Sequence, residues 1–151
     1  MTIAQSARRP LEVLLVEDNP GDVRLTREAF RSARRLTNLS VVGDGVEALD
    51  FLHRRGRHQQ APRPDLVMLD LNLPRKTGAE VLHDIKTDVK LKRIPVVILT
   101  TSRTTQDIIQ SYELHANCYI AKPVDLDQFV AVIRAIENFW LTLVELPPPA
   151  E

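Results

Sequence analysis

Short, continuous runs of apolar residues constrain the fold of this 151-residue chain more than any other feature. The runs are Leu11–Val16, a weaker one that ends in Val41 and Val42, Leu66–Leu71, Val96–Leu99 and Cys118–Ala121. A strand with one solvated face alternates apolar and polar residues, whereas a continuous apolar run is typical of a strand buried on both faces. The pattern therefore predicts a sheet that is covered on both sides.

Longer amphipathic segments separate these runs and are predicted to be helices. They cover residues 22–35, 46–55, 79–87, 106–114 and 126–144. Apolar residues recur in them at helical spacing, as Phe129, Ile133 and Ile136 do in the last one. Asp125, with Gln128 three residues later, is typical of a helix N-terminus. The alternation of strands and helices predicts an α/β fold with a parallel sheet.

Composition and charge narrow the class of protein. Lysine and arginine together number 20, as do aspartate and glutamate, so a strongly basic nucleic-acid-binding domain is not expected. No apolar run approaches the roughly 20 residues that span a bilayer. The polar start also lacks the apolar core of a signal peptide. We expect a cytoplasmic protein with a leader at 1–10, one domain at 11–144 and a Pro-rich tail at 145–151.

Polar side chains follow four of the predicted strands, at the carboxyl ends where ligands bind in such sheets. They are Glu17 and Asp18, Asp70, Thr100, and Lys122. Three crowded carboxylates repel one another unless a cation offsets their charge, and Mg²⁺ prefers such oxygen ligands. An ammonium and a hydroxyl beside the cation would complete a site for phosphate oxygens.

Each of these residues also has a simpler interpretation. Adjacent acids after a strand are usually a solvated turn, and Asp70 alone is equally suited to capping a loop. Thr100 alone would be a strand-end hydroxyl, and Tyr119 alone a half-buried core aromatic. The ordered combination favours a site, because these independent coincidences would all have to occur together.

The chain resembles the receiver domains of bacterial two-component response regulators over about residues 11–143. The resemblance rests on Glu17-Asp18, on Asp70 within Leu69-Asp70-Leu71-Asn72-Leu73-Pro74, on Gly78, Thr100 and Tyr119, and on Lys122-Pro123. It implies a flavodoxin-like, doubly wound, five-stranded parallel sheet in the order 2-1-3-4-5 with five helices.

The resemblance implies a metal site around the phosphoacceptor. Asp70 is then the residue that accepts the phosphoryl group. Asp18 and Asp70 bind Mg²⁺ through carboxylate oxygens, Asn72 through its backbone carbonyl, and Glu17 mainly through a metal-bound water.

It also implies roles for the residues that respond to phosphorylation. Thr100 and Lys122 bind the phosphoryl oxygens, and Tyr119 is the aromatic switch. The side chains of Asn72 and Ser102 tune the hydrolysis rate. The affected face is expected to be the fourth helix, the fifth strand and the fifth helix.

Three further stretches resemble small stand-alone regulators that partner phytochrome-type histidine kinases. They are Val16–Asp22, Glu113–Tyr119 and Phe139-Trp140. This resemblance implies a sensor histidine kinase, of the bacteriophytochrome type, as the phosphodonor. It also implies a homodimer through the last strand and helix with the C-terminal extension. Apolar residues on and after that helix, including Trp140 and Leu146, favour the dimer over local packing.

Two rival functions differ from this prediction at identifiable residues. Dehalogenase-type phosphatases need a second aspartate two positions after the nucleophile, where this chain has Asn72. Receiver-like modules that never take phosphate typically lose an acid or the lysine, and both are kept here. We therefore expect a signalling protein that catalyses only its own phosphorylation and dephosphorylation. Its output would be protein–protein contacts, or it would act as a phosphate sink.

Overall fold

The computed structural model describes residues 9–122 and 125–138 as one five-stranded sheet with helices on both faces. The strands are β1 (Leu11–Val16), β2 (Thr37–Val42), β3 (Leu66–Leu69), β4 (Val96–Thr100) and β5 (Cys118–Ala121). All pairings are parallel, in the order β2-β1-β3-β4-β5. The predicted fold class and strand order are confirmed.

Five α-helices and one short 3₁₀ helix lie between the strands or after the last one. They are α2 (Pro20–Arg31), α3 (Gly45–His53), η1 (Gly56–His58), α4 (Gly78–Thr87), α5 (Thr105–Glu113) and α6 (Leu126–Ile136). The predicted leader up to residue 8, the end of the last predicted helix from 139 and the Pro-rich tail lie outside the described residues. No helix in the described ranges combines the length and apolar character needed to cross a membrane.

The first helix lies earlier in the chain than the predicted 22–35. It begins at Pro20 because Asn19 caps it, accepting a hydrogen bond from the backbone N–H of Asp22. Proline suits the first helical turn, where its missing N–H has no intrahelical partner. The same kind of side-chain cap begins the other four α-helices, at Asp44, Thr77, Thr104 and Asp125.

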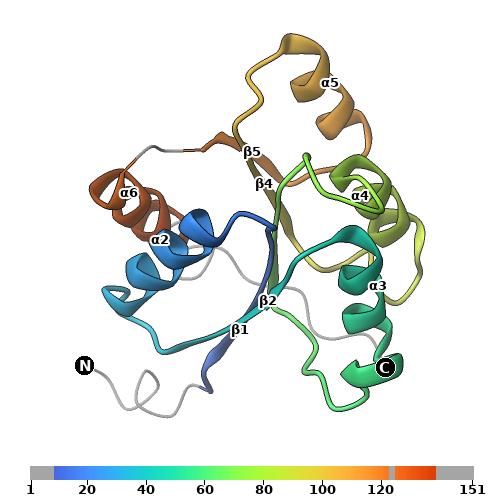
Figure 1. Ribbon diagram of the computed structural model, residues 1–151, viewed down its shortest axis with the longest axis horizontal. Helices are drawn as coiled ribbons and strands as arrows, with labels where there is room; N and C mark the ends of the chain where they lie inside the picture. The colour runs from blue at the N-terminus through green and yellow to red at the C-terminus, as the bar shows by residue number, and fades with distance from the viewer. Residues whose placement is uncertain (1–8, 123–124, 139–151) are drawn as a thin grey trace.

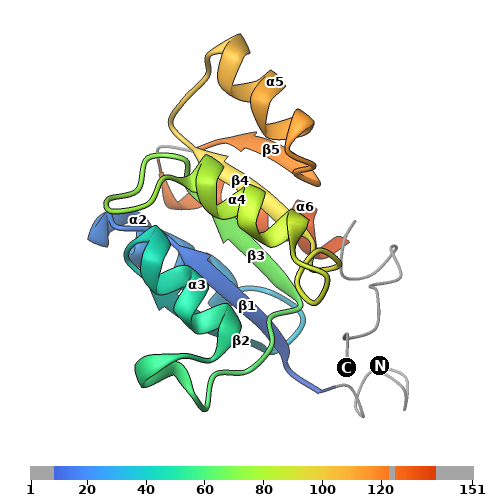
Figure 2. The same ribbon diagram turned by 90° about the vertical axis from the view of Figure 1, so that its right-hand side faces the viewer.

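The two faces of the sheet are covered by different helices. α2 and α6 pack on one face, whereas α3, α4 and α5 lie on the other (Figures 1 and 2). Along β1, Leu14 and Val16 belong to the core under α3 and α4, whereas Val13 and Leu15 belong to the core under α2 and α6. The continuous apolar run thus supplies two cores, because successive side chains point to opposite faces.

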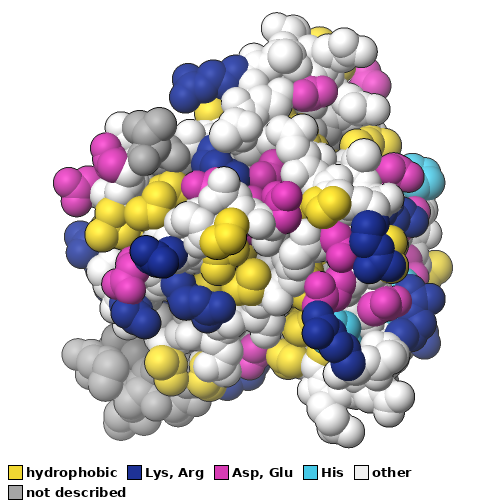
Figure 3. Space-filling model, in the orientation of Figure 1, with side chains coloured by type: hydrophobic (Ala, Val, Ile, Leu, Met, Phe, Trp, Pro, Cys, Tyr) yellow, Lys and Arg dark blue, Asp and Glu magenta, His cyan; other side chains and the backbone are white. Residues whose placement is uncertain are grey.

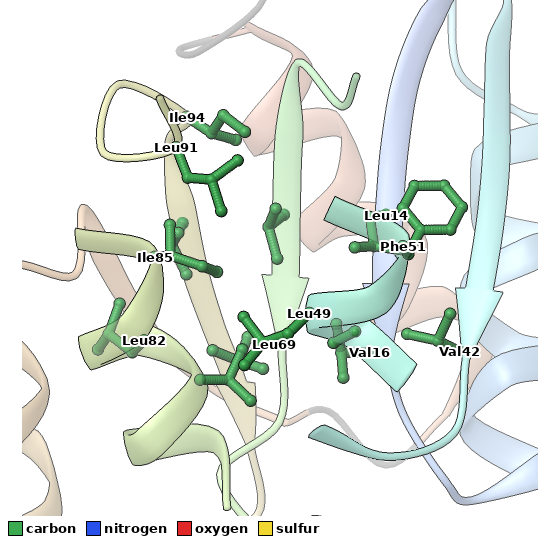
Figure 4. Packing of buried hydrophobic residues seen from close by; sticks show 14 of the residues in the cluster. Leu14, Val16, Val42, Leu49, Phe51, Leu69, Leu82, Ile85, Leu91 and Ile94 are labelled. Atoms are coloured by element: carbon green, nitrogen blue, oxygen red, sulfur yellow. The ribbon is translucent and has the colours of Figure 1, made fainter. Parts of the chain in front are cut away.

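The core under α3 and α4 closes over the strand ends that carry the polar residues. Val16 and Leu69 pack there with Leu49 of α3 and Leu82 and Ile85 of α4 (Figure 4). Because Glu17 and Asp70 directly follow Val16 and Leu69, this packing positions the backbone of the polar edge.

Gly78 brings the first turn of α4 against the loop that follows β3. Its N–H donates to the Leu71 carbonyl at 3.0 Å. A Cβ at this position would lie 2.1 Å from the carbonyl oxygen of Asp70 and 2.6 Å from the Cα of Leu71. Such distances are shorter than any van der Waals contact, so only glycine fits without moving the Asp70 backbone.

We expect Gly78→Ala to lower the free energy of unfolding by about 1–3 kcal/mol, because the added methyl group must push apart two backbone segments. Gly43→Ala is the matched control, since nothing lies within 4 Å of its added Cβ. This control should change stability by no more than about 0.5 kcal/mol. Urea unfolding of both variants measures the difference, and equal losses would contradict the close approach at Gly78.

Candidate functional site

The predicted site residues lie together at the carboxyl edge of the sheet. Backbone hydrogen bonds continue the strand pairing past the strand ends and hold each residue in place. The N–H of Asp70 donates to the Val16 carbonyl at 3.1 Å, and the N–H of Lys122 donates to the Thr100 carbonyl at 2.7 Å. Acidic side chains are visible near the centre of Figure 3, where the strand ends of Figure 1 converge.

Lys122 is the centre of this site. Its side chain is 4% exposed, and its Nζ donates to Glu17 Oε1 at 2.5 Å, Asp22 Oδ2 at 2.8 Å and Asp70 Oδ2 at 2.9 Å. An ammonium group has three N–H donors, so each donor has a carboxylate acceptor. This pairing is what makes a buried charge tolerable, since an unpaired one would be strongly destabilising.

The two buried carboxylates are also held by nearby backbone N–H groups. Glu17 Oε2 accepts from the N–H of Asn19, and Asp70 Oδ1 accepts from the N–H of Asn72, each at 3.1 Å. Asp18, between Glu17 and Asn19, is exposed. The carboxylate of Asp70 is therefore fixed in orientation on the inner side of the cluster, and that of Asp18 lies at its solvent side.

The protonation of this cluster reflects burial and charge pairing. Burial raises the pKa of Glu17, and the nearby Asp70 adds to that increase against the opposing bond from Lys122. Burial also acts to lower the pKa of Lys122, but the bonds to Asp22, Glu17 and Asp70 outweigh it and raise that pKa above its ordinary value. Lys122 therefore stays positively charged throughout the neutral pH range.

Three carboxylates at this edge fit a divalent cation. Glu17, Asp18 and Asp70 each offer an oxygen atom, and these atoms all lie within 4.8 Å of one another. Oxygen donors of this kind and number suit Mg²⁺, which binds a few carboxylates and keeps several waters. The predicted contribution of the Asn72 backbone carbonyl stays a prediction.

Thr100 and Tyr119 are joined through Ser102. The N–H of Ser102 donates to Thr100 Oγ1 at 3.4 Å, and the hydroxyl of Tyr119 donates to the Ser102 carbonyl at 2.8 Å. The Ser102 hydroxyl donates to Asp107 in the first turn of α5. The buried threonine at the end of β4, the aromatic residue of β5 and the helix α5 are thus linked by one residue.

Two residues of this arrangement were not predicted. Asp22 reaches Lys122 from the first turn of α2, and Asp107 holds Ser102 from the first turn of α5. In the sequence, both resemble ordinary acids at a helix N-terminus, where they complement the helix dipole. Lys122 is 100 residues from Asp22, and only the folded chain brings these two side chains together. Ser102 lies in the loop just before α5, five residues from Asp107.

Divalent cation binding should stabilise the protein through this cluster. At a Mg²⁺ concentration 100 times the dissociation constant, the gain in unfolding free energy is about 2.7 kcal/mol. Asp18→Asn replaces a charged carboxylate of the candidate site with a neutral amide, so we expect at least about tenfold weaker binding and a gain about 1.4 kcal/mol smaller.

Thermal or urea unfolding across a Mg²⁺ series measures this effect. Glu113→Gln is the control, because it removes an exposed carboxylate at the far end of α5. A Mg²⁺-dependent gain that is the same in Asp18→Asn and in the control would contradict the assigned metal site.

The fold and this edge cluster together define a class of signalling protein. The family model described as the response regulator receiver domain matches residues 13–134. The chain therefore belongs to the response regulator receiver domain family.

Relatives within that family narrow the comparison. The response regulator Rcp1 of Synechocystis sp. is 45% identical over 145 residues, which cover 96% of this chain and 99% of Rcp1. The crystal structure of the Mn²⁺-bound form of Rcp1 superposes with a TM-score of 0.85 at 47% identity, covering 92% of this chain and 100% of that one. The phosphorylated cyanobacterial phytochrome response regulator RcpA gives a TM-score of 0.88 at 47% identity, with 93% and 100% covered.

Proposed function

We propose that Asp70 accepts a phosphoryl group from a phosphohistidine of a sensor histidine kinase, with Mg²⁺ held by Glu17, Asp18, Asp70 and Asn72. The observation that carries this proposal is the buried Asp70 carboxylate, bonded to Lys122 at 2.9 Å and grouped with the two acids that follow β1. The phosphorylated state of RcpA and the Mn²⁺-bound form of Rcp1 support it, since both relatives share the fold and 47% of the sequence.

The transfer is an in-line displacement at phosphorus. An oxygen of the Asp70 carboxylate attacks, the P–N bond to the donor histidine breaks, and the imidazole nitrogen leaves with its electron pair. Because the other ring nitrogen of the phosphoimidazole carries a proton, the products are an acyl phosphate on Asp70 and a neutral histidine on the donor. When bound, Mg²⁺ supplies positive charge that offsets the phosphoryl oxygens.

The residues of this chain contribute positioning and electrostatic stabilisation. The bond from the Asn72 N–H orients the Asp70 carboxylate. Lys122 carries its charge to a phosphoryl oxygen, and the Thr100 hydroxyl donates to another. The oriented Asp70 carboxylate and the charged Lys122 are in place before the reaction, so little reorganisation of these two groups is needed as charge develops.

Water hydrolyses the acyl phosphate and returns Asp70 to its carboxylate form. We propose that Asn72 and Ser102, two positions beyond Asp70 and Thr100, set this rate. The chain acts on no separate substrate, because Asn72 stands where a dehalogenase-type phosphatase has its second aspartate. Its chemistry is then limited to its own modification and reset.

In this proposal, phosphorylation produces its output by changing the protein surface. A shift of Thr100 toward the phosphoryl group would move Ser102, and with it the partner atoms of Tyr119 and Asp107. Phosphorylation would therefore shift the population of conformers on the face formed by α5, β5 and α6.

We expect incubation with acetyl phosphate and Mg²⁺ to add the mass of one phosphoryl group to the wild-type chain. Asp70→Asn should show no gain, because the amide lacks a nucleophilic carboxylate oxygen. Intact-protein mass spectrometry reads out both, and Glu113→Gln is the control for a lost surface charge. A gain that survives Asp70→Asn would reject the assignment of the acceptor.

The donor is proposed to be a phytochrome-type histidine kinase of the source organism, since RcpA is a phytochrome response regulator. Phosphotransfer to this chain should be faster from such a kinase than from the other histidine kinases of the source organism, measured side by side. Faster transfer from an unrelated kinase would overturn this choice of donor and leave the chemistry at Asp70 intact.

We also propose a cytoplasmic homodimer that forms through β5, α6 and the chain after it. Ile109 and Tyr112 of α5 are 51% and 50% exposed, so the neighbouring surface already presents apolar side chains. The apolar residues predicted to extend this surface, Phe139 to Leu146, lie outside the described residues. Light scattering at tens of micromolar should give the dimer mass, with and without acetyl phosphate, and a monomer in both conditions would contradict it.

A further inference from the structure

In the part of the chain that the structure describes, Asp22 is the partner of Lys122 that neither the metal cluster nor the phosphoacceptor accounts for. Its Oδ2 lies 2.8 Å from the Lys122 ammonium, and its side chain is 22% exposed, against 4% for Lys122. Among the described residues, the group that can hold a cation consists of Glu17, Asp18 and Asp70. Asp22 therefore serves the ammonium from outside that group.

The first turn of α2 holds Asp22 firmly in this position. Its N–H donates to the Asn19 side chain at 3.1 Å, and its carbonyl accepts from the Thr26 hydroxyl at 2.8 Å. An acidic residue at the N-terminus of a helix is also stabilised by the helix dipole. The carboxylate consequently meets Lys122 from a rigid element and not from a loop.

A divalent cation and the ammonium compete for the same oxygen atoms. Lys122 bonds to Glu17 at 2.5 Å and to Asp70 at 2.9 Å, and both carboxylates also belong to the cation-binding group. Two positive charges at such distances repel each other strongly in a buried site. A carboxylate outside the cation-binding group offsets part of the ammonium charge. It also gives the ammonium a bonding partner that lies away from the cation.

We infer that Asp22 is a positioning residue for Lys122. It draws the ammonium toward α2, so that Glu17 and Asp70 can bind a divalent cation while Lys122 stays within reach of the phosphoryl group. This inference rests on the proposed function and assigns to α2 a direct part in assembling the charged site. Without Asp22, Lys122 has no carboxylate to turn to other than the metal-binding ones, so it competes more strongly with the cation and weakens cation binding.

Titration with Mn²⁺ alone, followed by calorimetry and by the loss of the free-ion electron paramagnetic resonance signal, tests the inference. Asp22→Asn should bind Mn²⁺ about three- to tenfold more weakly, because one unit of negative charge is lost beside the cluster. Asp22→Glu keeps the carboxylate and should recover most of the affinity. Glu28→Gln removes a carboxylate from the exposed side of the same helix and should bind as wild type does.

A double-mutant cycle separates positioning from simple charge. In the Lys122→Gln background, Asp22→Asn should weaken Mn²⁺ binding by a smaller factor than in the wild type, since no ammonium remains to be drawn aside. Equal factors in both backgrounds would overturn the inference, as would wild-type affinity in the Asp22→Asn single variant. Melting curves without metal verify that each variant is folded.

The same protein samples are also treated with acetyl phosphate. If the wild type gains a phosphoryl group and Asp22→Asn binds Mn²⁺ normally, the role of Asp22 is rejected and the proposed function stands. If the wild type gains no phosphoryl group, the proposed function fails, whatever the Mn²⁺ titration shows.

Discussion

One buried ammonium organises the polar edge of this protein. Lys122 follows β5, and its three carboxylate partners come from the end of β1, the first turn of α2 and the end of β3. Without a counter-charge, Glu17 and Asp70 could not both be buried as carboxylates beside each other. The charge of Lys122 thus makes the site compatible with folding, and it leaves enough excess negative charge to attract a divalent cation.

Backbone hydrogen bonding and the close approach of Gly78 fix the position of Asp70 in this cluster. The Asp70 N–H is bonded to the Val16 carbonyl, and the Asp70 carbonyl lies where any side chain at Gly78 would collide with it. Asp70 is therefore held between the neighbouring strand and the next helix. In the proposed function, a side chain that must react in line with a phosphoryl group benefits from such a rigid support, because small displacements reduce the reaction rate strongly.

The same edge links the candidate site to the surface formed by β5 and α5. Ser102 contacts Thr100, Tyr119 and Asp107 through three different groups, its N–H, its carbonyl and its hydroxyl. In the proposed function, a displacement of Thr100 would reach β5 and α5 through this one residue. In the proposed function, this short connection is what makes the modification of Asp70 readable by another protein.

The sequence by itself determined the fold class, the strand order through family resemblance, and the set of residues at the strand ends. It could do so because buried parallel strands are continuous apolar runs, and their carboxyl ends share one edge. The sequence pattern predicted the start of α2 two residues too late, because the helix begins at Pro20 after the capping residue Asn19. Only the tertiary structure revealed that Asp22 pairs with Lys122, 100 residues away. Asp107 lies only five residues from Ser102, but both acids already have a simpler explanation at a helix N-terminus. The contact of Asp22 with Lys122 joins two distant elements, and such a contact leaves no periodic trace in the sequence.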